Sequence, residues 1–294
     1  MKHKAGYVSI LGNPNVGKST LMNALVGERL SIVTSKAQTT RHRIMGIVNG
    51  ENFQIIYSDT PGIIDKPAYK LHESMMKYIH SALEDTDIIL YVTDVNEKPH
   101  IKEEILIKLK ELTIPILLAI NKIDLSTQEK VAALMKEWEK ILNFKEIIPI
   151  SALYASNLGY LFDKIIEFLP ESPPYYPKDE LTDRPQRFFV AEIIREKIFL
   201  NYHKEIPYST EVEIESFKEN DNLVHIVANI YVLRESQKAI IIGTKGQALK
   251  KVGTQARIDI ENFLGKKVYL ELNVKVRDNW RNRPNMLKNF GYTI

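Results

Sequence analysis

The stretch from Gly12 to Thr20, GNPNVGKST, combines glycines, a lysine and hydroxyl side chains at a spacing that can bind phosphate. An apolar run at residues 7–11, typical of a buried strand, precedes it, and residues 21–25 are typical of the start of a helix. Gly12 and Gly17 let the backbone approach an anion without a Cβ atom in the way. The setting favours a phosphate-binding loop over the alternative, an ordinary glycine-rich turn.

Two side chains of this loop carry the chemistry that a nucleoside triphosphate needs. The Lys18 amine can reach the β- and γ-phosphates, while loop N–H groups and the positive end of a helix dipole face the same anion. The Ser19 hydroxyl is a suitable Mg²⁺ ligand. The expected nucleotide-binding residues of the loop are Gly12, Asn13, Pro14, Asn15, Val16, Gly17, Lys18, Ser19 and Thr20.

A second segment, DTPG, follows a strand-like run at residues 53–57. An aspartate at the end of a strand can hold Mg²⁺ directly or through water, which is the role expected of Asp59. The backbone N–H of Gly62 is placed to sense a γ-phosphate. The alternative is a plain β-turn, because Asp, Pro and Gly all favour turns. The expected site residues are Asp59, Thr60, Pro61 and Gly62.

The choice of base is expected further along, where the apolar run at residues 114–120 leads into NKID. The carboxylate of Asp124 can accept hydrogen bonds from the N1–H and the amino group of guanine, whereas adenine offers no such pair of donors. A strand end with a helix cap is the alternative. A weaker signal is the run at residues 147–150 followed by Ser-Ala, because the Ala152 N–H could bond the guanine O6. The expected base-binding residues are Asn121, Lys122, Asp124, Ser151 and Ala152.

These four segments occur in one order, each after an apolar run, and the joint pattern resembles the Ras-like GTPases over about the first 170 residues. The resemblance implies that a threonine in residues 36–42, the candidate switch I, closes over Mg²⁺ and the γ-phosphate. We assign Thr40, with Thr39 as the alternative. The implied metal ligands are Ser19, Thr40 and Asp59, and the implied catalytic groups are Lys18, Thr40 and Gly62.

Two positions bear on the rate of hydrolysis. Ras-like enzymes often carry a water-orienting glutamine after the DTPG segment, and Ile63 cannot orient water through its side chain. Slow intrinsic hydrolysis of GTP to GDP and phosphate is therefore expected. Asn15 stands where several related GTPases hold a potassium ion, so K⁺ is a second expected ion beside Mg²⁺; the alternative is that Asn15 satisfies backbone groups of the loop.

Strand and helix patterns alternate over residues 1–170, which predicts an α/β domain with a mostly parallel sheet and helices on both faces. Four prolines then fall within residues 170–177, so residues 171–183 are expected to form a stiff linker. Residues 184–294 follow a different order: helix, strand, strand, helix–GTKG–helix, strand. That order predicts a second, α+β domain.

The second domain resembles a KH domain of the prokaryotic type. Two glycines around Thr-Lys let a loop pack against a sugar–phosphate backbone, and such a GxxG loop clamps about four nucleotides. Residues 236–258 contain five basic residues and no acidic one. The expected RNA-binding residues are Gly243, Thr244, Lys245, Gly246, Lys250 and Lys251.

The combination of a GTPase domain, a proline-rich linker and a KH domain resembles the Era family of bacterial GTPases over nearly the whole chain. The resemblance implies binding of GTP and GDP, and of the 3′ end of 16S rRNA, with a role in assembly of the 30S subunit. It also implies a cytoplasmic protein with peripheral contact to the inner face of the cell membrane. We expect a monomer.

Composition narrows the alternatives. The 294-residue chain has no cysteine, so disulfides and thiolate metal sites are excluded. The seven histidines show no HExxH spacing, and we predict that His72 and His80 are surface residues of one helix. No signal peptide is visible and no apolar run approaches the roughly 18 residues that span a bilayer, so a cytosolic protein is expected.

Charge is uneven along the chain. Residues 265–294 carry seven basic and two acidic residues, a net charge of +5 that leaves −2 for the rest of a chain of net charge +3. A basic end indicates a polyanionic partner; the alternative is a solvated charged surface. The rival function is a GTP-gated module that docks on lipid or protein. It is disfavoured because the apolar positions of residues 247–263 suit a domain core.

Overall fold

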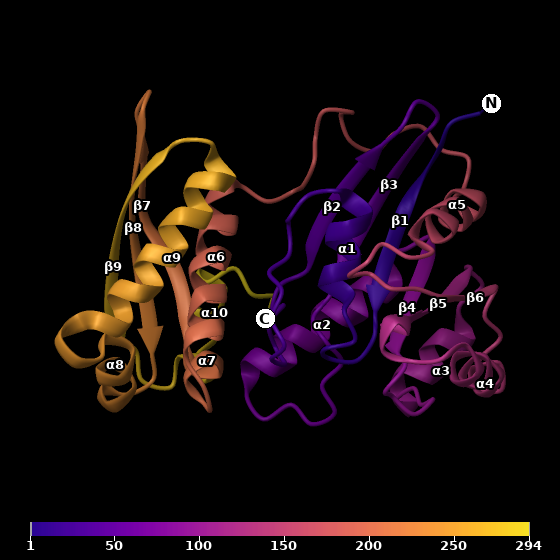
Figure 1. The fold of residues 1–294 in the computed structure, drawn as a ribbon, viewed down its shortest axis with the longest axis horizontal. Coiled ribbons are helices and arrows are strands. Elements are labelled where there is room, and N and C mark those ends of the chain that lie inside the picture. Colours follow the sequence, from indigo (N-terminus) through magenta and orange to yellow (C-terminus); the bar gives the residue numbers. More distant parts are fainter. Residues whose placement is uncertain (1, 294) are drawn as a thin grey trace. The chain divides into compact units, whose positions relative to one another are not determined.

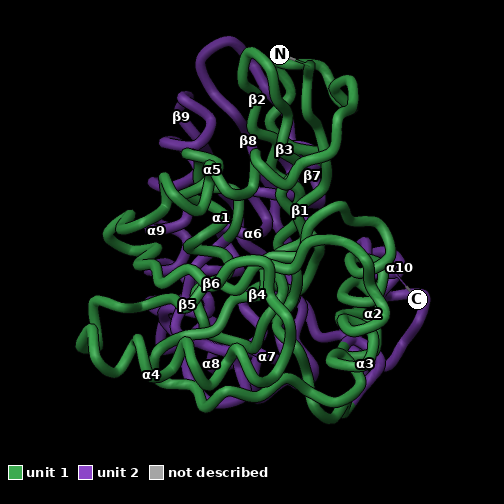
Figure 2. The backbone as a smooth tube through the Cα atoms, turned by 90° about the vertical axis from the view of Figure 1, so that its right-hand side faces the viewer, with its two compact units in different colours: residues 1–31, 40–68, 72–183 green, residues 32–39, 69–71, 184–294 purple. Residues whose placement is uncertain are grey.

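The computed structural model describes residues 2–293, which divide into two compact units (Figure 2). Unit 1 comprises Met1–Ser31, Thr40–Ala68 and His72–Asp183. Unit 2 comprises Arg184–Ile294 together with two short segments, Ile32–Thr39 and Tyr69–Leu71. Part of the candidate switch I therefore belongs by its contacts to unit 2, although it lies in the first third of the chain.

Unit 1 is built on a six-stranded sheet in the order β2-β3-β1-β4-β5-β6, parallel throughout except for the β2–β3 pair (Figure 1). Because the expected functional segments each follow a parallel strand, they meet at the carboxyl edge of the sheet, where open α/β sheets bind ligands. The strands are β1 (Lys4–Leu11), β2 (Ile44–Asn49), β3 (Phe53–Asp59), β4 (Ile88–Asp94), β5 (Ile116–Asn121) and β6 (Glu146–Pro149).

Helices cover both faces of this sheet (Figure 1). On one face, Ile79, Ile105 and Trp138 from three helices pack against strand residues such as Leu11 and Tyr91. Helices α1 and α5 lie on the other face. The helices are α1 (Lys18–Val26), α2 (Lys70–Glu84), α3 (Glu103–Glu111), α4 (Gln128–Trp138) and α5 (Leu158–Phe168), with a short η1 (Ile123–Leu125) after β5.

The proline-rich segment lies along unit 1 up to Asp183. Gln54 accepts hydrogen bonds from the N–H groups of Tyr175 and Tyr176, at 2.7 and 3.0 Å. The Ile47 N–H of edge strand β2 donates to the carbonyl of Leu181 at 2.8 Å. These contacts satisfy backbone groups that an edge strand and a proline-rich segment would otherwise leave to water.

Unit 2 places three helices on one face of a three-stranded sheet, in which β7 and β8 are antiparallel and β8 and β9 parallel. Apolar residues of α6, α8 and α9 form its core with alternate residues of β8. Its elements are α6 (Gln186–Asn201), α7 (Ile206–Ser209), β7 (Glu211–Glu219), β8 (Leu223–Val232), α8 (Glu235–Ile242), η2 (Thr244–Gly246), α9 (Gln247–Leu264), β9 (Lys267–Val276), η3 (Trp280–Asn282) and α10 (Pro284–Asn289).

The predicted fold class, an α/β unit followed by an α+β unit, is confirmed. One local prediction is wrong: His72 is 6% exposed rather than a surface residue. Its Nδ1 atom accepts a hydrogen bond from the Ala68 N–H at 3.2 Å, close to the start of α2. Within the described residues, no helix is both long and apolar enough to cross a membrane.

Candidate functional site

The loop from Gly12 to Gly17 joins β1 to α1 and requires glycine at both ends. Gly12 has a φ of +147°, and a Cβ atom there would lie 2.1 Å from the Val92 carbonyl oxygen. Gly17 has a φ of +97°, and its Cβ would lie 2.3 Å from the Asn121 side-chain nitrogen. No other residue type fits either position without moving the neighbouring backbone or Asn121.

Lys18 opens helix α1 and is 7% exposed. Its amine donates to the carbonyl oxygens of Gly12 and Asn13, at 3.0 and 2.8 Å. Burial lowers the pKa of this amine to about 8, although the carboxylates of Asp59 and Glu97 act in the opposite direction. A phosphate bound next to the amine would favour the charged form and raise its pKa.

Nucleotide binding should therefore take up a proton near pH 8.5. Lys18 in the free protein is then mostly neutral, and binding restores its charge, so roughly three quarters of a proton should be absorbed per GDP bound. GDP affinity should fall as the pH rises above about 8. Titration calorimetry in two buffers of different ionisation enthalpy measures the uptake. A value near zero would mean that the pKa of Lys18 in the free protein is not lowered.

The three expected metal ligands lie together. The Ser19 hydroxyl is 2.8 Å from the Thr40 hydroxyl and donates to Asp59 Oδ2 at 2.7 Å. Asp59 is buried, and its Oδ1 atom has no hydrogen-bond partner among the described residues. Burial raises the pKa of this carboxyl. Two hydroxyls beside a carboxylate with an unsatisfied oxygen fit a small, hard cation such as Mg²⁺.

Thr39, the alternative to Thr40, is used elsewhere. Its hydroxyl donates to the Lys36 carbonyl at 2.7 Å and lies 2.6 Å from the Thr34 hydroxyl. These bonds are internal to Ile32–Thr39 of unit 2, whereas Thr40 belongs to unit 1 with Ser19 and Asp59. The geometry favours Thr40 as the metal ligand.

The DTPG segment packs against the phosphate-binding loop. A Cβ atom at Gly62 would lie 2.8–2.9 Å from atoms of Pro14, so glycine is needed there. Thr60 is fully buried, and its hydroxyl donates to the Ile10 carbonyl at 2.8 Å, which leaves that side chain a positioning role. Ile63 is 4% exposed in the core, so its side chain is turned away from solvent and cannot orient water.

In the base-binding region, the structure separates the roles of two residues expected to select guanine. Asp124 Oδ1 accepts a hydrogen bond from the Ser151 hydroxyl at 2.5 Å, which orients the carboxylate. Asn121 is 3% exposed; its side-chain nitrogen donates to the Val16 carbonyl at 2.9 Å, and its oxygen accepts from two backbone N–H groups. Asn121 thus positions the loops, which leaves Asp124 as the better candidate of the two to read the base.

The Ala152 N–H already has a partner within the protein. It donates to Asn121 Oδ1 at 2.9 Å, because that buried oxygen needs a donor, so the guanine O6 would have to share this group. Lys122 has a positive φ of 63°, and its amine bonds Asp94 at 2.5 Å and the Asn15 carbonyl at 2.6 Å. Lys122 therefore connects the end of β4 to the phosphate-binding loop.

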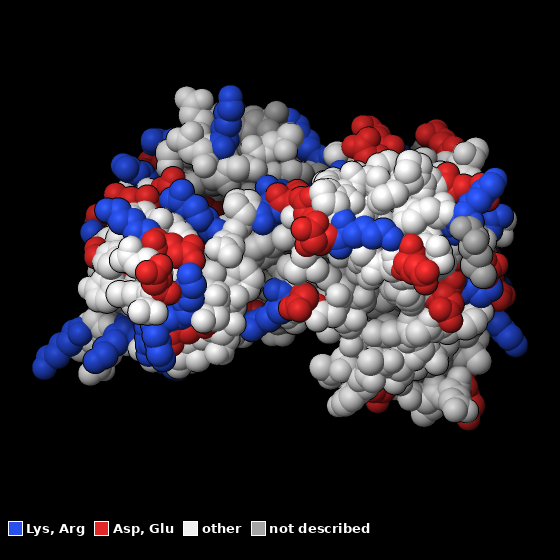
Figure 3. Space-filling view, turned by 90° about the horizontal axis from the view of Figure 1, so that it is seen from above, with Lys and Arg blue, Asp and Glu red and all other residues white. Residues whose placement is uncertain are grey.

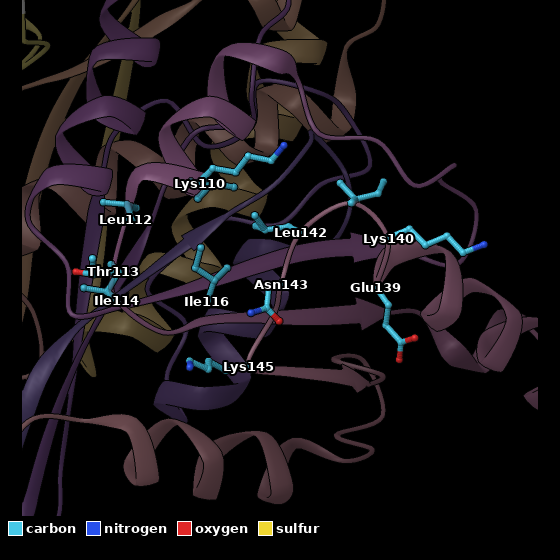
Figure 4. A pocket seen from close by; sticks show the side chains of 12 residues that line it. Lys110, Leu112, Thr113, Ile114, Ile116, Glu139, Lys140, Leu142, Asn143 and Lys145 are labelled. Atoms are coloured by element: carbon cyan, nitrogen blue, oxygen red, sulfur yellow. The ribbon is translucent and has the colours of Figure 1, made fainter.

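A cavity of about 520 Å³ lies in another part of unit 1 (Figure 4). Ends of α3 and α4 form it with the first residues of β5, so it lies at the amino edge of the sheet. Leu112, Ile114 and Leu142 contribute apolar walls, and no expected nucleotide-binding residue lines it. Because open α/β sheets bind ligands at the opposite edge, this cavity is not the nucleotide site.

In unit 2, the GTKG segment forms a tight connection between α8 and α9. Gly243, Lys245 and Gly246 all have positive φ angles, of 70°, 52° and 74°. A Cβ atom at Gly243 would lie 2.6 Å from the Ala248 Cβ, so glycine is required. Thr244 and Lys245 are exposed at the tip. The loop offers backbone and one cation to an approaching phosphate.

A groove of about 370 Å³ runs beside this loop between α9 and β9. Gly253 lies in the helix on this side; a Cβ there would come within 3.3 Å of the Leu272 side chain, so glycine keeps the groove open. Sequence reasoning counted Arg257 among the basic residues of this region but assigned neither it nor Gly253 to the RNA site, although their helical spacing from Gly246 and Lys250 would have pointed to them. The groove is lined by Gly246, Leu249, Lys250, Gly253, Thr254, Arg257, Leu270 and Leu272.

Two of the seven basic residues in 265–294 pair with glutamates of β7, so this surface is less basic than its composition indicates. Lys266 pairs with Glu219 at 2.6 Å and Lys275 with Glu215 at 3.3 Å. Arg281 stacks 4.1 Å from the ring centroid of Tyr69. Lys and Arg side chains instead project together at one end of unit 2 (Figure 3). The cations of α8, the GTKG segment and α9 are the better candidates for a polyanion.

Comparison with known proteins matches both units. Residues 7–122 match the family model described as "50S ribosome-binding GTPase", and residues 205–281 match the model described as "KH domain". GTPase Era of Staphylococcus haemolyticus is 46% identical over 99% of this chain and 98% of its own length. GTPase ERA1, chloroplastic, of Zea mays is also 46% identical, over 99% of this chain and 71% of its own length.

Two solved structures are similar over the full length. Era of Aquifex aeolicus bound to GDP and AlF₄⁻ has a TM-score of 0.94, 43% identity and coverage of 99% of this chain and 100% of its own. An Era complex with MgGDPNP and nucleotides 1506–1542 of 16S ribosomal RNA has a TM-score of 0.95, with the same identity and coverage. Each unit of this chain thus has a counterpart in a protein that binds a guanine nucleotide.

Proposed function

Because the chain belongs to the Era family of GTPases, we propose that it binds the 3′ end of 16S rRNA and acts in assembly of the 30S ribosomal subunit. It is a GTPase with a KH domain. The GxxG loop beside the α9–β9 groove carries the RNA part of the proposal, because it combines close backbone approach, exposed cations and a groove for bases. The Era relative solved with 16S rRNA nucleotides supports it.

The nucleotide site would work through electrostatic positioning. Ser19 and Thr40 would hold Mg²⁺ with Asp59 behind them, and the ion would neutralise charge on the β- and γ-phosphates. Lys18 would add a second positive charge, and the Gly62 N–H would donate to the γ-phosphate. The buried Ile63 leaves the attacking water without a side chain to orient it, so intrinsic turnover would be slow.

We further propose that Asn15 holds a potassium ion near the phosphates. Asn15 has a positive φ of 65°, and its side chain is exposed. No hydrogen bond from its amide to the loop occurs within residues 2–293, which disfavours the alternative that Asn15 serves the backbone. An amide oxygen suits K⁺, and the ion would stabilise charge that develops as the γ-phosphoryl group leaves.

GTP turnover should therefore be faster in potassium than in sodium at equal ionic strength, by about tenfold or more for one added cationic group. Asn15→Ala should abolish the difference while leaving the rate in sodium nearly unchanged. Initial rates of phosphate release at saturating GTP measure both. Equal wild-type rates in the two salts would exclude the ion, and an RNA or protein partner would then have to complete the site.

We also propose that nucleotide state and RNA affinity are linked. Within unit 2, helix α6 holds the segment that precedes Thr40: Arg195 donates to the Thr39 carbonyl, and Glu196 accepts the Val33 N–H at 3.1 Å. The same helix contacts α9 through Lys197–Asp259 and Asn201–Gln255. A change at Thr40 would thus act on an element packed against the RNA groove.

RNA affinity should differ between the GDP and GTP-analogue states, by about 5- to 150-fold for a typical coupling, and RNA should change nucleotide affinity by the same factor. Filter binding of a 16S 3′-end oligonucleotide at fixed salt measures the first factor. Equal RNA affinity in the two states would remove the switch. Crosslinking to cellular RNA with sequencing tests the target, and reads that avoid the 16S 3′ end would contradict it.

The rival function, docking on lipid, finds no support in helix α9. Its apolar residues Val252, Ala256 and Ile260 are fully buried in the core of unit 2 and are not available to a membrane. Its exposed large apolar residues, Ile258 and Phe263, are five positions apart, about 140° around the helix, so they do not form one apolar face. We propose a monomeric cytoplasmic protein. Any peripheral membrane contact would have to use another surface.

A further inference from the structure

The end of β4 and the loop that follows it contain no recognised motif, yet they contact the base-binding region, the phosphate-binding loop and the residues just after the DTPG segment. Asp94 bonds Lys122, Glu97 bonds Asn13, and Lys102 donates to the carbonyl of Ile64 at 3.1 Å. The first contact belongs to the base-binding region already described. We infer that Glu97 is a positioning residue for GTP binding, which holds Asn13 and thereby the phosphate-binding loop.

The contacts of Glu97 use both of its carboxylate oxygens. Oε1 accepts a hydrogen bond from the Asn13 side-chain nitrogen at 3.0 Å, and Oε2 accepts from the Thr93 hydroxyl at 2.8 Å. Thr93 is fully buried in β4, so the carboxylate is anchored to the sheet. The Asn13 carbonyl in turn accepts from the Lys18 amine at 2.8 Å. Glu97 thus fixes the residue against which Lys18 rests.

Holding Asn13 in place should lower the entropy cost of nucleotide binding. Between Gly12 and Lys18 the chain has no regular backbone hydrogen bonding and contains two glycines, so ordering it on nucleotide binding costs conformational entropy. Asn121 holds the far end of the loop at Val16, and Glu97 holds the near end at Asn13. A loop fixed at both ends before the nucleotide arrives binds more tightly because less order remains to be imposed.

The inferred role of Glu97 in holding Asn13 is geometric, since a carboxylate near a triphosphate repels it. Its charge acts separately, by raising the pKa of Lys18. Glutamine at this position keeps an acceptor for Asn13 and offers its amide as a donor to Thr93, whose hydroxyl can rotate to accept. Glu97→Gln should therefore retain the contacts with Asn13 and Thr93, whereas Glu97→Ala removes both. Asn13→Ala removes the Asn13–Glu97 hydrogen bond by deleting its donor.

The experiment compares these variants with Asn13→Ala/Glu97→Ala and with Glu103→Ala, an exposed glutamate at the start of α3. Stopped-flow release of a fluorescent GDP analogue gives the dissociation rate, and steady-state turnover gives KM and kcat. Glu97→Ala should raise the dissociation rate and KM by about five- to tenfold, the size of one lost hydrogen bond. Glu97→Gln and Glu103→Ala should stay within about twofold of wild type.

The double variant decides the mechanism. If Glu97 acts through Asn13, the double variant should release GDP no faster than either single variant, whereas multiplied effects would overturn the inference. An unchanged release rate in Glu97→Ala would overturn it too, and Asn13→Ala repeats the test if Glu97→Ala lowers the melting temperature. The inference rests on residues 12–20 as the phosphate-binding loop. Lys18→Ala checks that separately, because intact GDP binding in it would refute the loop assignment itself.

Discussion

Asp124→Asn should weaken GTP binding by on the order of 100-fold and let xanthosine triphosphate compete, because one charged acceptor pair to guanine is lost. The carboxylate can only accept hydrogen bonds, whereas the amide can also donate to the xanthine carbonyl. Because backbone groups occupy the Asn121 amide, Asp124 is the one of these two side chains that stays available to the base, and Ser151 orients its carboxylate.

Competition of unlabelled GTP and xanthosine triphosphate against labelled GDP measures the two affinities. Asp163→Asn, which makes the same chemical change at an exposed site on α5, is the control and should keep wild-type preference. Ser151→Ala should weaken GTP binding less than Asp124→Asn, since the carboxylate remains but is no longer oriented. An Asp124→Asn protein that prefers GTP as strongly as wild type would show that another group selects guanine.

Sequence patterns predicted the central strands of unit 1 because those strands are buried on both faces and read as continuous apolar runs. Strand β2 escaped prediction. It is an edge strand that contains Gly46, and a Cβ there would meet the side chains of Met22 and Val26 at 2.8 Å. Gly46 allows helix α1 to pack closely against the strand and does not form a turn. Only the folded structure distinguishes these two uses of a glycine.

The nucleotide site was predictable where its residues are neighbours in sequence. The spacing of Gly12, Gly17 and Lys18 is enough to predict a phosphate-binding loop. The folded loop requires both glycines because a Cβ atom at either position would collide with a neighbouring atom. The roles of Asn121 and Glu97 were not predictable, because each depends on a partner more than 80 positions away. A residue's type suggests what it can bond, but tertiary structure decides what it does bond.

The distribution of surface charge was harder to predict for the same reason. Residues 265–294 carry a clear excess of basic residues, but β7 supplies glutamates that pair with Lys266 and Lys275. Strand order and register determine which charged residues pair, and neither can be predicted from the composition of one segment. By contrast, the cations around the GTKG segment lie at or near the start of a helix that the sequence pattern predicted. The groove beside this segment supports the prediction that these cations belong to the RNA site.

Changing Thr244 and Lys245 together to aspartate should lower RNA affinity by more than about 100-fold at physiological salt. Two carboxylates would then face the RNA phosphates at the closest point of backbone approach, and one cation would be lost. GTP affinity and the melting temperature should stay at wild-type values, because both side chains are exposed and aspartate tolerates the left-handed backbone of Lys245.

The matched control is His203→Asp/Lys204→Asp in the same unit. Lys204 is exposed like Lys245 and has nearly the same backbone conformation, with a φ of 54° against 52°, so the paired change tests charge without the loop. Fluorescence anisotropy of a labelled 16S 3′-end oligonucleotide, repeated at several salt concentrations, measures both affinity and its salt dependence. The salt slope should fall by about one in the loop variant, since each phosphate contact contributes a slope of roughly one. If the loop variant and the control bind RNA equally well at every salt concentration, the GTKG segment lies outside the RNA interface, and the groove beside it loses its proposed role.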